Sequence, residues 1–396
     1  MRRVAFLFSH PIQYFAPLMR QLAARPEIEL TAYFCSRMGV EEALDPGFGQ
    51  TFKWDIPLLE GYRSHFLPAV QRGQTVRGWM NPFNPAIAPE LVRSRYDVLV
   101  MHGYASATNW LAFLAARLAG TVVLFRGEVR LRSDQPAGWS AVKSLGLRAM
   151  FRMFVDGCLY IGARSQEFYA HYGVPAHRLF FTPYCVDNDF FQTWAARLAP
   201  ERANLRAGLG ITDDRPVILF VGKLASKKQP LMLLQAYAML RRKYHCALVY
   251  AGDGELRGAL ETMIRAQNIP DVNITGFLNQ TEIPRVYAAA DILVLPSLVT
   301  ETWGLAINEG MNFGLPVIVT DLVGCSPDLV EPECNGYVVP WNDTAALAEA
   351  LAVLVQDDVR RAAFGRRSRE IIGRWNIGAC ATGVVQAVQA LTAHRD

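Results

Sequence analysis

Short apolar runs alternate with longer amphipathic stretches along most of the chain. In the first half, the apolar runs predict strands at 3–8, 29–35, 97–101, 121–126 and 157–161. The stretches between them predict helices at 15–24, 106–119 and 140–154. Parallel strands need crossover connections of this kind, so the pattern predicts a parallel sheet covered by helices.

The second half repeats this pattern more regularly. It predicts strands at 216–222, 247–251, 272–276, 292–295 and 316–320, and helices at 230–243, 253–267 and 377–393. We therefore expect an α/β protein of two doubly wound, Rossmann-like domains, at 1–190 and 191–375, followed by a terminal helix at 376–396. Two such domains in tandem would face each other across a cleft at the carboxyl ends of their strands, where open α/β sheets bind ligands.

Two segments depart from the alternation. Residues 40–90 are rich in Gly, Pro and aromatic residues and predict a long excursion of loops and short elements. We expect this excursion to recognise an acceptor. Residues 183–200 lose periodicity, and we expect them to be the linker between the domains.

Composition narrows the class of protein. A hydrophobic content of 51% with 19% charged residues indicates a folded chain. No apolar run reaches the roughly 20 residues of a membrane-spanning helix, and the first run, 4–8, is too short for a signal-peptide core. The seven cysteines are scattered without a Cys-x-x-Cys pair, which argues against a disulfide framework or a zinc site. We expect a cytoplasmic protein.

Charge is distributed unevenly. Residues 1–200 carry 21 Lys/Arg and 15 Asp/Glu, a balance of +6, whereas 201–396 carry 19 and 21, a balance of −2. Within 126–154, six basic residues alternate with apolar ones: Arg126, Arg130, Arg132, Lys143, Arg148 and Arg152, with Trp139, Met150, Phe151, Met153 and Phe154. Two interpretations stay open: peripheral contact with an anionic membrane, at the inner face of the cytoplasmic membrane, or a core-packed helix with a solvated basic face.

Two carboxylates in one short segment carry the strongest chemical signal. Glu301 follows the strand at 292–295, and Glu309 lies about two turns inside a helix expected to open near Gly304. Eight helical residues rise about 12 Å, comparable to the distance from hexose to ribose in a nucleotide sugar. The amides of Gly304, Leu305 and Ala306 would offer a helix N-terminus to diphosphate oxygens. Two solvated acids near a helix start are the alternative.

Two cations in a second loop complement these acids. Lys223 and Lys228 lie between a buried strand and a helix, where they would neutralise a departing diphosphate. The Gly-x-x-x-x-Gly-Lys pattern of a P-loop is absent. Solvated loop lysines are the alternative, which we favour for Lys227.

These motifs resemble those of retaining glycosyltransferase family 4, which has the GT-B fold and belongs to the glycogen-synthase-like superfamily. The resemblance rests on the two motifs above together with seven further segments. Four lie in the second half: 251–255 (Ala-Gly-Asp-Gly-Glu), 274–277 (Ile-Thr-Gly-Phe), 289–297 (Ala-Ala-Asp-Ile-Leu-Val-Leu-Pro-Ser) and 314–318 (Gly-Leu-Pro-Val-Ile). Three looser ones lie in the first half: 9–14 (Ser-His-Pro-Ile-Gln-Tyr), 101–103 (Met-His-Gly) and 183–187 (Pro-Tyr-Cys-Val-Asp). It is close across about 216–345 and looser in the first half.

The resemblance implies a role for each matching residue. Glu309 would hold the ribose, Glu301 the donor sugar, and Lys223 and Lys228 the diphosphate. The backbone at Gly276 and Phe277 would contact the base. His102 would face the sugar and the acceptor, unless it is a structural histidine. The helix after Trp375 would cross back to the first domain.

Two departures from the family pattern affect the expected site. The family often has Arg at the position of Lys223. The lysine of this chain keeps the positive charge but lacks the bidentate fork of a guanidinium group. The first loop of the family often carries a glycine pair where this chain has Ser9, His10 and Pro11. Since Pro11 has no amide hydrogen, we expect Ser9 and His10 to contact the donor instead.

The resulting hypothesis is a retaining, metal-independent glycosyltransferase without a cofactor. It would move a sugar from a UDP- or GDP-linked donor to a glycan, lipid-linked or small-molecule acceptor in cell-surface polysaccharide or glycolipid synthesis, without a nucleic-acid partner. An epimerase or phosphorylase on the same fold, or a non-catalytic nucleotide-sugar sensor, are the alternatives. Asp187-Asn-Asp189 has the spacing of a metal-binding Asp-x-Asp motif, but its place in the expected linker disfavours that function. The sequence leaves the oligomeric state open.

Overall fold

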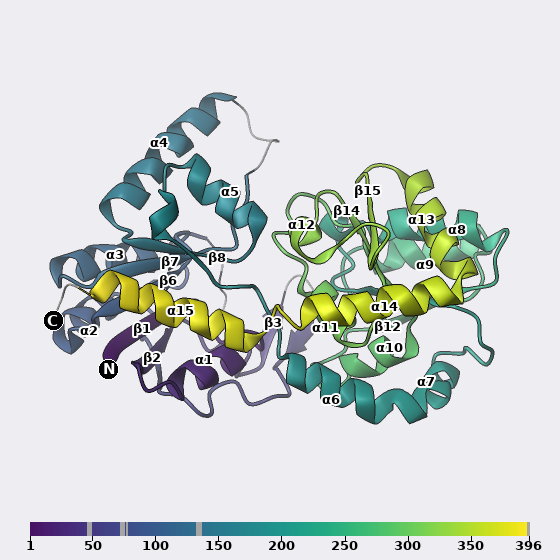
Figure 1. Ribbon diagram of the computed structural model, residues 1–396, viewed down its shortest axis with the longest axis horizontal. Helices are drawn as coiled ribbons and strands as arrows, with labels where there is room; N and C mark the ends of the chain where they lie inside the picture. The colour runs from purple at the N-terminus through teal and green to yellow at the C-terminus, as the bar shows by residue number, and fades with distance from the viewer. Residues whose placement is uncertain (46–49, 72–75, 77, 132–136, 394–396) are drawn as a thin grey trace. The chain divides into compact units, whose positions relative to one another are not determined.

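The chain folds into two α/β units, each built on one parallel sheet (Figure 1). The computed structural model describes residues 1–45, 50–71, 76, 78–131 and 137–393. Unit 1 comprises Met1–Leu44, Thr51–Tyr184 and Ile377–Asp396, and unit 2 comprises Asp45–Gln50 and Cys185–Asn376. The last helix, α15 (Ile377–Thr392), therefore belongs to unit 1.

Unit 1 contains a seven-stranded sheet in which every pairing is parallel. Its order is β5 (Ser64–Phe66), β2 (Ile28–Phe34), β1 (Arg2–Phe8), β6 (Val98–His102), β7 (Val122–Arg126), β8 (Gly157–Tyr160) and β9 (Leu179–Phe181). The helices are α1 (Phe15–Ala23), α2 (Ile87–Ser94), α3 (Ala107–Leu118), α4 (Ala137–Met153), α5 (Ala163–His171) and α15. The short strands β3 (Ala43–Asp45) and β4 (Gln50–Phe52) pair only with each other.

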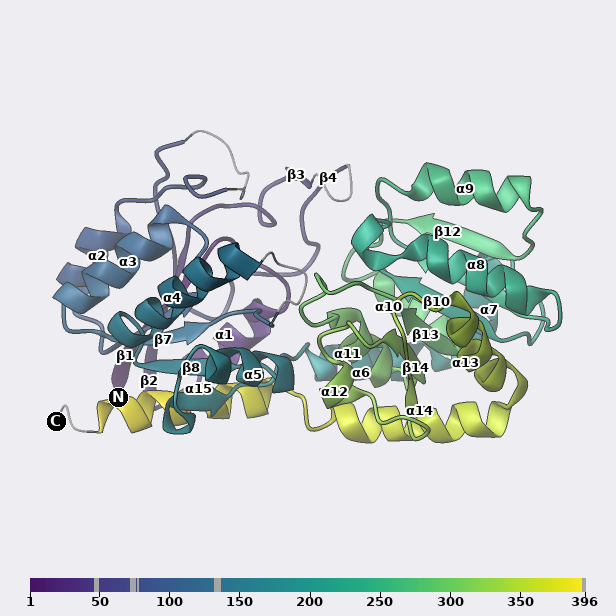
Figure 2. The same cartoon turned by 90° about the horizontal axis from the view of Figure 1, so that it is seen from above.

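Helices cover both faces of the unit 1 sheet because successive strand side chains point to opposite faces. Ala5 and Leu7 of β1 pack into the core cluster that also holds buried residues of α2, α3, α4 and α5. Phe8, which points the other way, contacts Phe15 of α1 at a ring-centroid distance of 4.9 Å. Helix α15 packs against α1 and against β7, β8 and β9, and Figure 2 shows it along one edge of the unit.

Unit 2 contains a six-stranded parallel sheet. Its order is β12 (Val272–Gly276), β11 (Ala247–Ala251), β10 (Val217–Val221), β13 (Ile292–Leu295), β14 (Val317–Thr320) and β15 (Gly336–Val339). The helices are α6 (Asn188–Leu198), α7 (Arg202–Gly208), α8 (Pro230–Arg241), α9 (Arg257–Ala266), α10 (Ile283–Ala289), α11 (Leu305–Asn312), α12 (Ser326–Leu329), α13 (Thr344–Gln356) and α14 (Asp358–Ile372).

Both sheets reverse their strand order at one point. Counting main-sheet strands along the chain, each sheet runs 3-2-1-4-5-6, with one further strand, β9, in unit 1. The reversal lies between β1 and β6 in unit 1 and between β10 and β13 in unit 2. At such a switch point the loops from the two central strands leave in opposite directions, which opens a crevice at the carboxyl edge of the sheet.

At the opposite, amino edge of both sheets, an aspartate forms the same pair of hydrogen bonds with a neighbouring strand. Asp97, directly before β6, exchanges two hydrogen bonds with Arg3: its Oδ2 accepts from the Arg3 amide at 2.7 Å, and its own amide donates to the Arg3 carbonyl at 2.9 Å. Asp291, directly before β13, makes the same pair with Val217 at 2.8 and 2.9 Å. Asp156 repeats the contact with Val123 at 2.8 Å in both bonds. Each carboxylate thereby satisfies the first free amide of a neighbouring strand.

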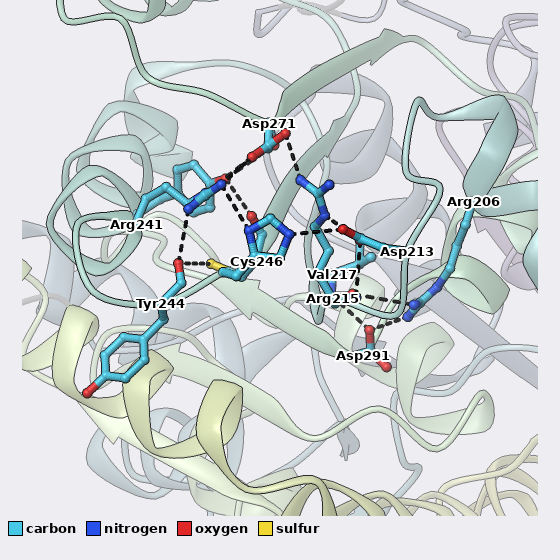
Figure 3. Close-up of polar contacts among 11 residues, drawn as sticks. Arg206, Asp213, Arg215, Val217, Arg241, Tyr244, Cys246, Asp271 and Asp291 are labelled. Atoms are coloured by element: carbon cyan, nitrogen blue, oxygen red, sulfur yellow. Dashed lines mark hydrogen bonds and ion pairs between the residues drawn. The ribbon is translucent and has the colours of Figure 1, made fainter.

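In unit 2 this aspartate is also the acceptor for two arginines. Arg202 donates to Asp291 at 2.7 Å, and the largely buried Arg206 donates to its second oxygen. Figure 3 shows Asp291 with Arg206 and, beside them, a second group in which Arg215 bridges Asp213 and Asp271. The dense pairing indicates that this edge serves stability.

The structure confirms the predicted strands and crossover helices to within a few residues. It also contains elements that the pattern missed, among them strands β5, β9 and β15 and helices α2, α5, α13 and α14. The described part of 40–90 consists of loops, three short strands and the start of α2, as expected. The chain passes from unit 1 to unit 2 between Tyr184 and Cys185, inside the predicted linker at 183–200, but the segment is not irregular, because Asn188–Leu198 forms helix α6. Asp187 caps that helix, with its side chain accepting from the Phe190 amide at 3.0 Å.

Candidate functional site

The carboxyl edge of unit 2 brings together a cation and an acid from the two loops at the switch point. The loop after β10 ends in a short 3-10 helix, Ser226–Lys228, and the ammonium group of Lys228 forms an ion pair with Glu301 in the loop after β13. Both side chains are mostly buried, at 14% and 13% exposed. Lys228 also lies over Gly222, since a Cβ there would be 3.8 Å from its Nζ. Lys223 lies in the same loop, and Lys227 is exposed.

Close backbone contacts hold these loops in place. Gly222, directly after β10, donates to the Ala251 carbonyl at 3.0 Å, and a Cβ at Gly252 would overlap the Gly222 carbonyl. A Cβ at Gly254 would lie 2.7 Å from the Leu224 carbonyl oxygen. The sequence Gly252-Asp-Gly254 therefore serves close packing of two loops, as glycine permits.

Gly324, which the sequence analysis did not single out, lies in the loop after β14 and contacts the backbone of the Glu301 loop. Its amide donates to the Glu301 carbonyl at 3.1 Å, and the Cys325 amide donates to the Trp303 carbonyl at 3.0 Å. A Cβ at Gly324 would overlap the Thr302 carbonyl. The loop after β14 thus fixes the backbone on both sides of Thr302.

Helix α11 begins at the carboxyl edge with its first amides uncapped by a side chain. Its N-cap is Gly304, which has a φ of 103°, and Leu305 and Ala306 form its first turn. A side chain at Gly304 would lie 2.7 Å from Leu295, so glycine is required by both conformation and space. A helix N-terminus of this kind favours an anion.

Glu309 lies in the second turn of α11 and is almost completely buried, with 4% exposed. The Tyr287 hydroxyl donates to its Oε2 at 2.6 Å. Tyr287 itself stacks on Phe313, with ring centroids 5.4 Å apart. The sequence analysis missed Tyr287, although Ala-Ala-Asp after it belongs to a recognised motif, because an apolar helix position gives no sign of a hydroxyl contact.

Gly276 ends β12, the edge strand, and Phe277 follows it in the next loop. Gly276 has a φ of 79° and lies beside the ion pair of Arg257 and Asp253, which are 2.8 Å apart. A Cβ at Gly276 would lie 3.5 Å from the Arg257 guanidinium. The loops after four neighbouring strands of unit 2 therefore carry Gly276 and Phe277, Asp253, the two lysines, and Glu301.

The other three predicted residues lie at the carboxyl edge of unit 1. Ser9 and His10 follow β1, with Ser9 Oγ 2.9 Å from His10 Nδ1, and His102 ends β6. A pocket of about 260 Å³ opens at this switch point. Its lining residues are Leu7, Phe8, Ser9, Cys35, Val76, Gly78, Asn81, Pro82, His102, Gly103, Ala105, Ser106 and Asn109.

The imidazole of His102 is held in an aromatic environment. Its ring lies 4.8 Å from that of Phe15 and 5.7 Å from that of Phe8, and its buried Nε2 has no hydrogen-bond partner among the described residues. Burial, with smaller contributions from the charges of Arg126 and His10, lowers the pKa of His102 to about 3. The residue is therefore a neutral imidazole near pH 7, able to donate or accept a hydrogen bond.

Neither the Asp-x-Asp motif nor any other described cluster is arranged as a metal site. Asp187 is engaged as the cap of α6. Across the described residues, we find no group of three or more His, Cys, Asp or Glu side chains placed to hold a metal ion. No helix in the described ranges is both long and apolar enough to span a bilayer.

Comparisons with known proteins agree with this geometry. Residues 201–371, most of unit 2, match the family model "Glycosyl transferases group 1". An alpha-D-kanosaminyltransferase of Streptomyces kanamyceticus is 36% identical over 186 residues, 46% of this chain and 47% of that protein. A GDP-mannose-dependent alpha-(1-6)-phosphatidylinositol monomannoside mannosyltransferase of Mycobacterium tuberculosis is 28% identical over 67% of this chain and 69% of that protein. The chain spans about half the length or less of several relatives it matches.

Solved structures extend the likeness to both units. The UDP complex of Anabaena Alr3699/HepE superposes with a TM-score of 0.72 at 16% identity, covering 97% of this chain and 98% of that one. WaaG, a glycosyltransferase involved in lipopolysaccharide biosynthesis, gives a TM-score of 0.65 at 16% identity, covering 97% and 99%. The chain has the GT-B fold. The two Rossmann-like units expected from sequence are confirmed.

Proposed function

We propose that the chain is a retaining, metal-independent glycosyltransferase that uses a nucleotide diphosphate sugar. The single observation that carries this proposal is the Lys228–Glu301 pair at the switch point of unit 2. Glu301 lies in the loop that leads to the uncapped N-terminus of α11 and to the buried Glu309. A cation, a helix N-terminus and two carboxylates match the diphosphate and the two sugars of such a donor.

In this proposal unit 2 is the donor-binding domain. Lys223 and Lys228 bind the diphosphate together with the amides of Gly304, Leu305 and Ala306. Glu309, oriented by Tyr287, accepts from the ribose hydroxyls, and Glu301 accepts from the hydroxyls of the transferred sugar. The backbone at Gly276 and Phe277 contacts the base. When donor binds, the ammonium group of Lys228 would leave Glu301 and pair with the diphosphate.

Unit 1 is the acceptor side, with residues 377–392 as its terminal helix. The pocket beside Ser9, His10 and His102 receives a neutral, hydroxyl-bearing part of the ligands, because His102 offers an uncharged hydrogen-bonding group there. The bond between the anomeric carbon and the diphosphate breaks, the acceptor oxygen takes its place on the same face, and the hydroxyl proton leaves with the nucleoside diphosphate. The fixed lysines and helix amides carry the developing charge, so we propose no cofactor and no metal requirement.

The relatives suggest the donor and the acceptor class. HepE was crystallised with UDP and UDP-glucose, and the Mycobacterium tuberculosis relative depends on GDP-mannose and acts on a phosphatidylinositol monomannoside. We therefore propose a UDP- or GDP-linked donor and a glycan or lipid-linked acceptor, in a cytoplasmic setting.

Ligand-induced stabilisation tests the donor site directly. UDP, GDP and ADP are added in the presence of EDTA, and the unfolding temperature is followed. A ligand at a hundred times its Kd adds about 2.7 kcal/mol to the free energy of unfolding, so the correct base should be evident. Stabilisation that required added Mg²⁺ would contradict metal independence, and no response to any nucleotide would contradict the donor site.

Turnover separates transfer from the alternatives. The chain is incubated with UDP-glucose or GDP-mannose, with and without a lipid extract that supplies acceptors. We expect nucleoside diphosphate release that depends on the extract, and an α-linked product from an α-linked donor. An epimerised sugar nucleotide formed without acceptor would indicate an epimerase, and tight binding without any release would indicate a sensor.

A further inference from the structure

The outer surface of unit 1 over α3 and α4 combines exposed apolar side chains with basic ones. Two leucines are among the most exposed in the described part of the chain: Leu118 of α3 at 86% and Leu145 of α4 at 72%. Leu114, Val142 and Met153 are exposed as well. Clusters of large exposed apolar residues on a folded protein commonly mark an interaction surface.

These residues form one row on each helix, and the two rows approach each other at Met153; we call them together the strip. On α4, Val142, Leu145, Ala149 and Met153 follow one another at intervals of three or four, which places them on a single face of the helix. Met153 lies next to α3, because the Arg117 Nε donates to its carbonyl at 2.6 Å. Leu114 and Leu118, one turn apart, extend the strip along α3.

The charged residues of α3 and α4 themselves have one sign. Residues 107–118 and 137–153 contain no Asp or Glu, whereas they contain Arg117, Lys143, Arg148 and Arg152. Arg148 and Arg152 are exposed and flank the apolar side chains of α4. Asp156, three residues after α4, is bound to Arg117 at 3.2 Å.

The structure also changes which residues of 126–154 face outward. Arg126 and Arg130 are buried, as are Met150 and Phe151, so they do not belong to a surface. Arg132 and the side chain of Trp139 lie outside the described residues. The sequence-based interpretation of a core-packed helix is therefore correct for one face of α4, and the surface consists of the opposite face together with α3.

We infer that this strip, defined by Leu114, Leu118, Val142, Leu145 and Met153 with the surrounding basic residues, docks unit 1 on an anionic lipid bilayer. Apolar side chains insert at the level of the headgroups while arginines and lysines bind the lipid phosphates, which is the arrangement of interfacial helices. The absence of acids from the residues of α3 and α4, beside four basic ones, favours an anionic bilayer as the partner. The inference is independent of the proposed sugar transfer.

Flotation with vesicles of two compositions tests the inference. The full chain is mixed with phosphatidylcholine vesicles, or with vesicles of equal parts phosphatidylcholine and phosphatidylglycerol, and the bound fraction is measured at low and high salt. We expect binding to the anionic vesicles only, weakened by salt. Indifference to lipid charge, or no binding to either vesicle, overturns the inference.

Paired variants locate the surface. R148Q/R152Q should lower affinity for anionic vesicles about thirty-fold, because each basic residue near such a surface contributes roughly a factor of five. L118Q/L145Q should lower it about tenfold or more through lost apolar insertion. The matched controls are R366Q and V359Q on α14 of unit 2, the latter at a valine that is 75% exposed. Equal losses in the controls overturn the inference.

Sedimentation without vesicles distinguishes a second copy of the chain from a bilayer. If the parent self-associates and L118Q/L145Q makes it monomeric, the strip is a subunit interface and the inference is wrong. A monomeric parent that binds anionic vesicles supports it. Because the substituted side chains are exposed, unfolding temperatures close to that of the parent should confirm that all variants are folded.

Discussion

The two units have nearly the same framework and different side chains at the same place in it. Each sheet reverses its order between its first and fourth strands, and in each the fourth strand is preceded by an aspartate that binds the start of the first. At the carboxyl edge the similarity ends. Unit 1 presents a neutral imidazole among aromatic rings, and unit 2 presents an ion pair, a buried carboxylate and a helix N-terminus.

This difference shows what topology decides and what it leaves open. Strand order determines where a crevice forms, because the loops diverge there in both sheets. Loop residues then decide which ligand the crevice suits. A pyrophosphate requires positive charge and free amides, which unit 2 offers, whereas a neutral pocket suits hydroxyl groups. The proposed division of donor and acceptor roles between the units rests on this contrast.

The largest expected effect comes from removing the cation at the unit 2 switch point. Lys228→Ala should lower kcat about 100-fold, close to 3 kcal/mol in activation free energy, because a fixed charge that stabilises the leaving diphosphate is lost. The measurement is nucleoside diphosphate release under saturating donor. The matched control is Lys227→Ala, one residue away and exposed. Equal losses in both variants would show that the loop needs positive charge in general.

The amino-edge aspartates should differ in the stability they provide. Asp291→Ala removes two arginine partners and the acceptor of the Val217 amide, at a site where Arg206 is 10% exposed. We expect a loss of about 2–3 kcal/mol in the free energy of unfolding. Asp97→Ala, whose carboxylate is 31% exposed, should cost about 1 kcal/mol. Urea unfolding measures both, and a larger loss for Asp97 would reverse the ranking.

Periodicity gave most of the framework correctly, because apolar strands and amphipathic crossovers leave a clear signal. It failed at α6, where Asn188–Leu198 mixes polar and aromatic residues and only Phe191 and Leu198 of its apolar side chains are buried. With so few core positions, the helix has a weak apolar stripe and Asp187 as its main start signal.

The candidate site was predictable only for residues whose type is unusual in its context. Glu301, Glu309 and Lys228 are charged residues beside buried strands, and the structure brings Glu301 and Lys228 into contact. Gly324 and Tyr287 act through a close backbone approach and a single hydroxyl contact. Neither property can be read from spacing, because both depend on segments that meet only in the folded chain.

The neutral character of the unit 1 switch point should appear as acid sensitivity. The unfolded chain binds a proton at a histidine near pH 6.5, whereas folded His102 does so only near its lowered pKa of about 3. The folded state therefore loses stability as the pH falls between these values. At pH 5 the loss is about 2 kcal/mol, and His102→Gln should remove it.

Unfolding by urea at pH 7 and pH 5 measures this effect as a difference between parent and variant. His177→Gln, at an exposed histidine, is the matched substitution and should keep the pH profile of the parent. If the His102 variant loses as much stability on acidification as the parent does, then His102 is not the buried neutral group that distinguishes unit 1 from unit 2.

The smallest expected effect comes from removing the hydroxyl group that orients the buried carboxylate of Glu309 in unit 2. Tyr287→Phe removes only the hydroxyl, and with it the hydrogen bond to Glu309 at 2.6 Å and a longer contact with the Ala306 carbonyl at 3.4 Å. Because Glu309 is proposed to bind the ribose, we expect the Kd for nucleoside diphosphate to rise about fivefold to tenfold, with kcat nearly unchanged. Tyr237→Phe is the control, since Tyr237 is equally buried but its hydroxyl binds backbone carbonyls of Cys246 and Pro270, each at 3.0 Å. That variant should lose stability and keep its affinity. The opposite result, with affinity falling only for Tyr237→Phe, would remove Glu309 from the donor site and leave the ion pair as the one charged feature that separates unit 2 from unit 1.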